Sequence, residues 1–295
     1  MLRAMTSTEK PDVTVIGIGA IGMPMARRLT THGFAVTAID PNVEACISAE
    51  GHGMRALPDV ASAPVGDVVL VLVATGDQLL DTVRRATSDR KVERETWIIS
   101  STVGPRAAQQ AAQVLGGAGA GVIDAPVTGG VPGAENGTLR FLVAGDRLSI
   151  DYFTPLFSVL GTVTVVGDRV GDGQATKLVN QLCSSVHLAA AAEALAFATR
   201  LGLDPVTTAA VIAGGSGSSW FLDERGPRMA ELGTVPPVLT RLAILAKDNE
   251  LVEREADARG AVVPLLKAAK TQYAHAQELG LLDCDDSQII RAYLE

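Results

Sequence analysis

The pattern of secondary structure changes once along the chain, near residue 173, and this change constrains the fold more than any other feature. Before it, short runs rich in β-branched residues alternate with helical stretches, whereas only helical periodicity follows it. Strands that alternate with helices at this spacing predict βαβ units and a mostly parallel sheet. We therefore expect an α/β domain over residues 11–170, a long interdomain helix over 171–200 and an all-helical domain over 201–295.

Individual elements can be placed from the same pattern. The predicted strands are Val13–Ile16, Ala35–Ile39, Asp67–Val73, Trp97–Ser100, Gly121–Asp124, Phe141–Val143 and Val163–Val166. Predicted helices between the first strands include Met23–Thr31, Gln78–Ala86 and Pro105–Leu115. In the C-terminal part, glycine and proline interrupt the helical pattern at 202, 214–217, 233–237 and 260–264.

A glycine-rich turn follows the first predicted strand. Gly17, Gly19 and Gly22 form the pattern G-x-G-x-x-G, and a helical stretch comes directly after it. In a dinucleotide-binding turn, the first glycine permits the tight turn and the second lets a pyrophosphate approach the backbone. The third glycine lets the helix pack on the strand. Because N–H groups at the start of a helix attract phosphates, this turn predicts a Rossmann-type NAD(P) site that includes Ala20 and Ile21.

Asp40 follows the second predicted strand. A carboxylate at this place can accept hydrogen bonds from the adenosine ribose, and it repels a 2′-phosphate. The next residues, Pro41 and Asn42, supply no arginine. The sequence therefore favours NAD over NADP, although Asp40 as a simple cap of the following helix is the alternative.

A second glycine-rich segment, Asp124-Ala125-Pro126-Val127-Thr128-Gly129-Gly130, follows a predicted strand. Ligands of open α/β sheets bind at the carboxyl ends of the strands. The hydroxyl of Thr128 and the unobstructed N–H groups of Gly129 and Gly130 could together hold a substrate carboxylate. An ordinary glycine-rich surface loop is the alternative.

The long helix carries a polar stripe formed by Lys177, Asn180, Gln181, Ser184 and His187. Such a stripe on an otherwise Ala- and Leu-rich helix indicates that one face lines a cleft. Burial in a cleft lowers the pKa of a lysine, which can then exchange a proton with an alcohol or carbonyl oxygen. The alternative is a solvated lysine on an exposed face, and for His187 we favour a packing role over that of a second base.

Composition excludes several classes of protein. With 25 Lys and Arg against 33 Asp and Glu, the net charge is −8, which disfavours a nucleic-acid-binding protein. The three cysteines are too few and too far apart for a metal cluster or a disulfide framework, and they favour the cytosol. Residues 1–10 contain no apolar core of signal-peptide length. The longest apolar runs, Val68–Ala74 and Leu188–Ala198, are shorter than a membrane-spanning helix, so we expect no membrane association.

Taken together, these motifs resemble the β-hydroxyacid dehydrogenase family, which includes 3-hydroxyisobutyrate dehydrogenase and tartronate semialdehyde reductase. The resemblance runs from about Val13 to the C-terminus. It rests on the glycine turn, the segment 124–130, the pattern Gly171-x-Gly173-x-x-x-Lys177-x-x-Asn180-Gln181 and the pair Lys247-Asp248. The chain departs from the usual pattern in having Thr128 where serine is common and Asn249 where an apolar residue is common, which leaves the substrate open.

The resemblance implies roles for individual residues. It implies that Lys177 is the proton donor or acceptor during hydride transfer, that Asn180 holds the substrate beside it, and that residues 128–130 bind the substrate's acid group. The residues it implies for cofactor contacts outside the glycine turn and Asp40 are Val73, Ala74, Gln78, Thr102 and Lys247.

The predicted activity is NAD-dependent interconversion of a short β-hydroxy acid and its semialdehyde, by a homodimer or homotetramer. The alternatives are a tartronate semialdehyde reductase-like enzyme, an imine reductase-like NADP(H) enzyme and a non-catalytic dinucleotide-binding protein. Imine reductases and non-catalytic relatives commonly lack the lysine, so Lys177 argues against both of them.

Overall fold

The computed structural model describes residues 10–295. The prediction that no signal peptide is present concerns residues 1–10, of which residues 1–9 lie outside the described residues. The chain divides into two compact units, with the boundary between Lys177 and Leu178. The sequence predicts three segments, over residues 11–170, 171–200 and 201–295, and their boundaries stay a prediction.

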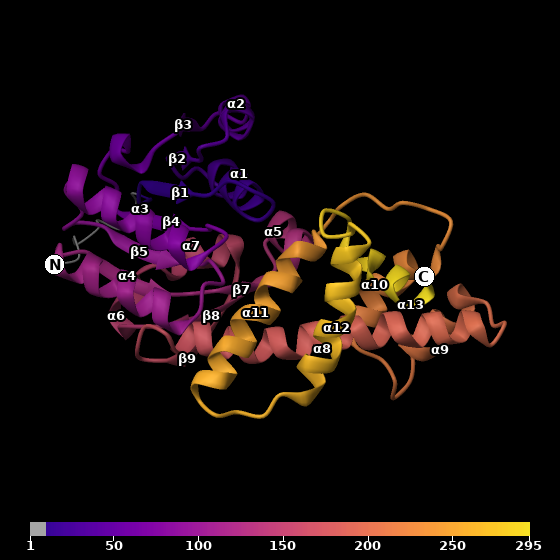
Figure 1. The fold of residues 1–295 in the computed structure, drawn as a ribbon. Coiled ribbons are helices and arrows are strands. Elements are labelled where there is room, and N and C mark those ends of the chain that lie inside the picture. Colours follow the sequence, from indigo (N-terminus) through magenta and orange to yellow (C-terminus); the bar gives the residue numbers. More distant parts are fainter. Residues whose placement is uncertain (1–9) are drawn as a thin grey trace. The chain divides into compact units, whose positions relative to one another are not determined.

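A mostly parallel sheet forms the centre of the first unit (Figure 1). Its nine strands within the described residues are β1 (Val13–Ile16), β2 (Val36–Ile39), β3 (Arg55–Leu57), β4 (Val68–Val71), β5 (Thr96–Ile99), β6 (Gly121–Asp124), β7 (Val127–Thr128), β8 (Leu139–Ala144) and β9 (Gly161–Gly167). The order is β3-β2-β1-β4-β5-β6-β8-β7, and β9 pairs with β8. Only the pairs β6–β8 and β7–β8 are antiparallel. The α/β fold expected from the sequence is therefore confirmed.

Helices cover both faces of this sheet. They are α1 (Gly22–Thr31), α2 (Val43–Gly51), the 3-10 helix η1 (Val60–Ser62), α3 (Gly76–Asp89), α4 (Pro105–Gly117), α5 (Gly130–Asn136), α6 (Arg147–Tyr152) and α7 (Thr154–Leu160). One core contains residues of α1, α2, α5, α6 and α7, and the other contains residues of η1, α3 and α4. Every residue of the central strands β1, β4 and β5 is buried, because helices pack on both sides.

The second unit is helical. It contains most of α8 (Asp172–Arg200), followed by α9 (Pro205–Ala213), α10 (Trp220–Ala230), α11 (Leu242–Ala258), α12 (Pro264–Glu278), the 3-10 helix η2 (Asp286–Ile290) and α13 (Arg291–Leu294). Three of the four breaks that glycine and proline predict fall between these helices, and the fourth, 260–264, ends at Pro264, the first residue of α12. From Gly173 to the C-terminus there is no strand, and one isolated bridge joins Arg241 to Asp285.

By length and composition alone, α8 is apolar enough to cross a membrane, which differs from the expectation drawn from the shorter run Leu188–Ala198. Half of its most apolar window is buried inside the protein. Leu188, Ala192 and Leu195 of this helix belong to the core of the second unit. Part of the apolar surface of α8 is thus buried in the core of the second unit, whereas Val179 and Phe197 of the same helix are exposed.

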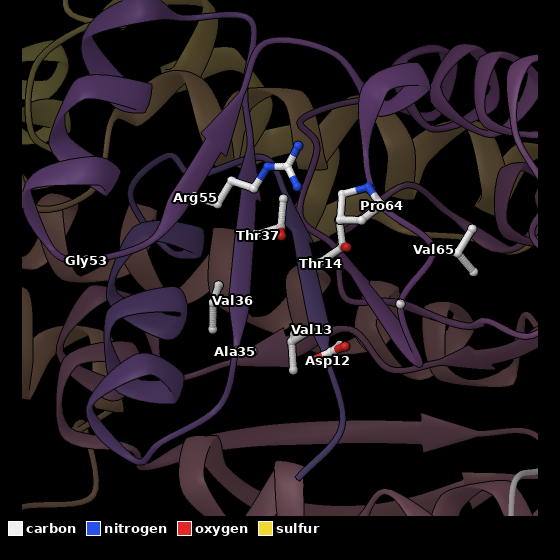
Figure 2. Close-up of a pocket in the computed structure, with 11 residues that line it drawn as sticks. Asp12, Val13, Thr14, Ala35, Val36, Thr37, Gly53, Arg55, Pro64 and Val65 are labelled. Carbon is white, nitrogen blue, oxygen red and sulfur yellow. The ribbon is translucent and has the colours of Figure 1, made fainter.

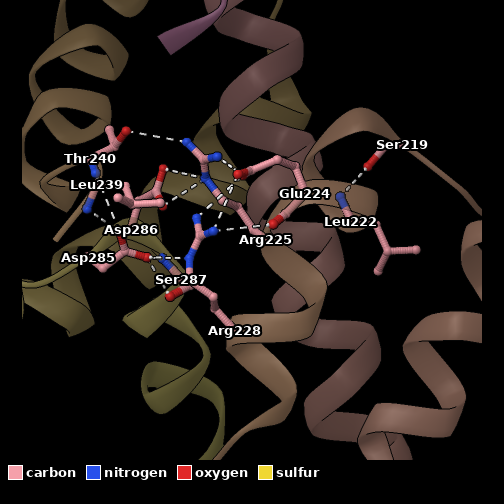
Figure 3. Close-up of polar contacts among 10 residues, drawn as sticks. All are labelled: Ser219, Leu222, Glu224, Arg225, Arg228, Leu239, Thr240, Asp285, Asp286 and Ser287. Atoms are coloured by element: carbon pink, nitrogen blue, oxygen red, sulfur yellow. Dashed lines mark hydrogen bonds and ion pairs between the residues drawn. The ribbon is translucent and has the colours of Figure 1, made fainter. Parts of the chain in front are cut away.

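A buried ionic network fixes the segment between α10 and α11 (Figure 3). Arg225 of α10 makes an ion pair with Asp286 at 2.9 Å, and Arg228 makes one with Asp285 at 3.2 Å. Asp285 also accepts hydrogen bonds from the backbone N–H groups of Leu239 and Thr240. Because both aspartates are fully buried, these bonds replace the water that the carboxylates lose on folding.

Two strands were not predicted. β3 is three residues long and lies at the edge of the sheet, so it has too few residues to show a periodic pattern. β7 consists of Val127 and Thr128 alone, where the sequence predicts a loop. The other predicted strands are present, with ends that agree or differ by at most two residues.

Candidate active site

The glycine turn between β1 and α1 has the geometry that the sequence predicts. Gly17 has φ +86°, and a Cβ there would lie 2.5 Å from the carbonyl oxygen of Leu72. A Cβ at Gly22 would lie 1.9 Å from the carbonyl oxygen of Gly17. Neither position can accept a side chain, because each glycine meets rigid backbone. At Gly19, by contrast, a Cβ would meet nothing within 4 Å, so this face of the turn is open.

The open turn presents hydrogen-bond donors. Within residues 10–295, the N–H groups of Gly19, Ala20 and Ile21 donate to no acceptor. They directly precede α1, whose N-terminus carries no acidic residue in its first turn. Unpaired N–H groups and the positive end of a helix dipole together suit a phosphate group.

Asp40 lies at the end of β2, beside this turn. One carboxylate oxygen accepts a hydrogen bond from the N–H of Ile18 at 3.0 Å, and the other accepts one from the N–H of Asn42 at 2.9 Å. Asn42, rather than Asp40, is the residue that caps α2, since its side chain accepts from Glu44 and Ala45. The alternative in which Asp40 caps this helix is therefore wrong.

The segment after β4 contains the other predicted cofactor contacts of this part of the chain. Val73 is half-buried, and Ala74 is exposed. The side chain of Gln78 closes the capping box of α3 with Thr75, and its Oε1 also accepts from the N–H of Ala74 at 2.8 Å. Gln78 therefore fixes the backbone that carries Ala74.

The two predicted substrate-binding glycines both have positive φ. Gly129 has φ +124° and Gly130 has φ +62°, so the chain turns sharply between β7 and α5. Thr128 precedes them in β7, where it pairs with Arg140 of β8. All three are half-buried, and the sheet holds the hydroxyl-bearing residue in place.

One buried amide joins three segments of the first unit. Gln174, in the first turn of α8, is fully buried, and its Oε1 accepts hydrogen bonds from the N–H groups of Val103 and Gly104, both at 3.0 Å. Its Nε2 donates to the carbonyl oxygen of Ser101 and to Oδ1 of Asp124, also at 3.0 Å. The segment 101–104 includes the predicted cofactor contact Thr102.

Asp124 holds the start of α8. Its Oδ2 accepts from the N–H groups of Gly171 at 2.8 Å and Gln174 at 3.0 Å, so a carboxylate from β6 caps the helix. Burial raises the pKa of Asp124 above its usual value, whereas these hydrogen bonds oppose the rise. A Cβ at Gly173 would lie 2.6 Å from the carbonyl oxygen of Leu142, so only glycine allows this close approach.

Lys177 comes one turn after Gln174 on the same helix. It is 7% exposed, so the alternative of a solvated lysine is wrong. Of the polar stripe, Gln181 and Ser184 are also buried and Asn180 is half-buried, whereas Val179 on another face of the helix is 65% exposed. His187 is exposed, which differs from the packing role we favoured for it.

In the second unit, a chain of polar contacts links Asn180 to Lys247. Asn180 donates to Gln181 at 3.0 Å, and Gln181 donates to Oδ2 of the buried Asp248 at 2.6 Å. Lys247 makes an ion pair with the other oxygen of Asp248 at 2.9 Å. The two residues predicted to contact substrate and cofactor are thus oriented through the same carboxylate.

A separate cavity of about 320 Å³ lies at the opposite ends of the strands (Figure 2). It is lined by the starts of β1 and β2, including Thr14 and Thr37, together with Arg55 and the segment 64–66. Since ligands of such sheets bind at the carboxyl ends of the strands, we do not assign the predicted chemistry to this cavity.

Two family models match almost the whole chain. Residues 12–167 match the NAD-binding domain of 6-phosphogluconate dehydrogenase, and residues 171–293 match the model described as NAD-binding of NADP-dependent 3-hydroxyisobutyrate dehydrogenase. This chain belongs to the β-hydroxyacid dehydrogenase family. It is therefore an NAD(P)-dependent oxidoreductase, as the sequence motifs predict, and the open glycine turn fits a nicotinamide dinucleotide.

Individual relatives support this assignment over almost their full lengths. An uncharacterised oxidoreductase of Synechocystis is 32% identical over 96% of this chain and 98% of the relative. The L-threonate dehydrogenase of Cupriavidus necator is 31% identical over 96% of both chains. The crystal structure of 3-hydroxyisobutyrate dehydrogenase from Salmonella typhimurium has a TM-score of 0.85 at 27% identity, and covers 96% of this chain and 99% of that one.

Sequence reasoning missed the residues whose hydrogen bonds hold the predicted site residues in place. Gln174 and Asp124 lie within the predicted motifs, but nothing in the motif spacing shows that their side chains meet. The sequence places Gln181 on the polar stripe and at the end of the motif that contains Lys177, and it gives Asp248 only as the neighbour of Lys247, without a role for either side chain. The one available signal was a polar residue at a helix position that faces the protein interior.

Proposed function

We propose that this protein interconverts a short β-hydroxy acid and its semialdehyde with NAD(H), and that Lys177 exchanges a proton with the reacting oxygen. The observation that carries the proposal is the burial of Lys177 one turn after the anchored start of α8. A lysine removed from water releases its proton more readily, which suits proton exchange near neutral pH.

The other predicted residues supply binding and orientation. The N–H groups of residues 19–21 would hold the pyrophosphate, and the nicotinamide accepts or returns the hydride when the cofactor is bound. Thr128, Gly129 and Gly130 would hold the carboxylate of the substrate, and Asn180 would hold the substrate beside Lys177. Holding the reactants in one geometry removes much of the entropic barrier.

Asp40 supports a preference for NAD. Its carboxylate is held next to the glycine turn by Ile18 and Asn42, where it would repel a 2′-phosphate. In Asp40→Asn, the side chain keeps its size but loses its charge. We expect the ratio of kcat/KM for NAD to that for NADP to fall by about tenfold, which corresponds to about 1.4 kcal/mol. An unchanged ratio would show that Asp40 does not select the cofactor.

The names of the relatives above give different hydroxy acids as substrates. The substrate of this protein is therefore best identified with a panel of compounds. NADH formation should be followed with 3-hydroxyisobutyrate, 3-hydroxypropionate, glycerate, L-serine, L-threonate and 4-hydroxybutyrate, each with NAD and with NADP. Turnover of one compound supports the proposal. Thermal stabilisation by NAD without any turnover would instead favour a non-catalytic dinucleotide-binding protein.

We also propose that the protein forms a homodimer or homotetramer in the cytosol. The support is the exposed apolar surface of the second unit, which includes Val179, Phe197, Val211 and Trp220. The three cysteines are free, as expected in a reducing compartment. Light scattering during size-exclusion chromatography tests the assembly, and a monomeric mass would contradict it.

A further inference from the structure

We infer that Gln174 is a positioning residue for the reaction, which sets the place of Lys177 and of the segment 101–104 relative to the end of β6. The inference rests on the proposed function for the role of Lys177. Gln174 itself would touch neither substrate nor cofactor, since its side chain is fully buried and directed at other residues of the first unit.

The amide of Gln174 is used to its full capacity. An amide oxygen has two acceptor positions and an amide nitrogen has two donor positions, and all four are occupied at 3.0 Å. The partners come from two segments that lie between 50 and 73 residues earlier in the chain. One side chain thus ties together the loop after β5, the end of β6 and the first turn of α8.

Helix geometry transmits this anchoring to Lys177. The two residues are three positions apart, so their Cα atoms lie on adjacent turns of one face. The first turn is also capped by Asp124 and pressed against Leu142 at Gly173. A shift of the first turn therefore changes the position from which Lys177 reaches the reacting oxygen, and it also releases the segment that carries Thr102.

No other uncharged aliphatic side chain of this length offers both donors and acceptors. Methionine has a similar size, but it would leave the buried N–H groups of Val103 and Gly104 without partners. Glutamate keeps the two acceptor contacts, but it would direct a carboxylate oxygen at Oδ1 of Asp124 and at the carbonyl oxygen of Ser101. The two substitutions thus disturb the network in different ways.

The test compares Gln174→Glu and Gln174→Met with the unchanged protein on the panel compound that shows turnover. We expect kcat to fall by about 100-fold in both, as for a small misplacement of a catalytic group, while KM for NAD changes much less, because the hydrogen bonds of the Gln174 side chain go to neither the glycine turn nor Asp40. Two variants are needed because either one alone could fail to fold. A wild-type kcat in a folded variant would overturn the inference.

A matched control is Gln109→Glu. Gln109 is exposed on α4, and its Nε2 donates a single hydrogen bond to the carbonyl oxygen of Val170, next to the same helix start. We expect this variant to keep its kcat. An equal loss in the control would show that any added charge near α8 is sufficient, and it would overturn the specific role of Gln174.

A compensating pair separates positioning from general damage. In Asp124→Asn combined with Gln174→Glu, the amide introduced at position 124 can donate to the carboxylate introduced at position 174, which reverses the polarity of the original bond. We expect the double variant to recover about tenfold of the activity that Gln174→Glu loses, as for coupled neighbours. If the activity losses of the two single variants simply add in the double variant, the two side chains are not directly coupled and this part of the inference is overturned.

Amide hydrogen exchange gives a readout that does not need activity. Peptides covering residues 101–104 and 171–177 should exchange faster in Gln174→Glu than in the unchanged protein, whereas the rest of the first unit should not. If the unchanged protein turns over no compound, the proposed function fails, and exchange alone decides whether Gln174 anchors these segments. Unchanged exchange would overturn the inference.

Discussion

At the scale of a single residue, Lys177 is the most direct test of the proposed chemistry. Lys177→Ala removes the group that would exchange the proton, so we expect kcat to fall by about 10²–10⁴-fold. The affinity for NAD should stay nearly unchanged, because the glycine turn lies elsewhere in the chain. Steady-state kinetics and NADH fluorescence measure the two quantities separately.

Lys267→Ala is the matched control, since Lys267 is an exposed lysine of α12. It should retain full activity. If Lys177→Ala remains as active as this control, Lys177 does not carry the proton.

At the scale of an element, the start of α8 depends on Gly173. In Gly173→Ala the new Cβ would lie 2.6 Å from the carbonyl oxygen of Leu142 and 2.9 Å from the carboxylate of Asp124. Neither group can move freely, because one is sheet backbone and the other is fully hydrogen-bonded. We expect the free energy of unfolding to fall by about 1–3 kcal/mol, as for overpacking, measured by urea unfolding.

Gly214→Ala provides the comparison for this variant. Gly214 follows α9 with φ −88°, and a Cβ there would meet nothing within 4 Å. Its free energy of unfolding should change by less than about 1 kcal/mol. Equal effects of the two substitutions would contradict the steric explanation for Gly173.

At the scale of the whole molecule, the buried ionic network makes stability depend on pH. Burial raises the pKa of Asp286 to about 6, against the attraction of the Arg225 guanidinium. The folded state therefore binds more protons than the unfolded state between about pH 4 and pH 6. The stabilising contribution of Asp286 is complete below this range and is lost as the pH rises through it.

Asp286→Asn removes this titration. The free energy of unfolding of the unchanged protein minus that of the variant should decrease from about pH 4 to pH 6 and then level off, because only the unchanged protein loses stability as Asp286 ionises. Urea unfolding across this range measures it. Two parallel curves would show that Asp286 titrates alike in the folded and unfolded states.

The main elements could be predicted because their signals are local. The buried strands β1, β4 and β5 are apolar runs, and the helices after them begin with glycine, Thr75 or Pro105 at their N-termini. The short strands β3 and β7 could not be predicted, because they exist only through pairing with strands that are already in place.

The sequence by itself determined the α/β and helical parts and the glycine turn, because each depends on neighbours within one turn or one strand. The residues expected to carry the chemistry follow from the resemblance of the motifs and stay a prediction. The tertiary structure alone decided that Gln174 meets Ser101 and Asp124, and that Gln181 meets Asp248. These partners are 50 to 73 residues apart. No periodic pattern records such contacts, since they form only when packed elements bring distant side chains together.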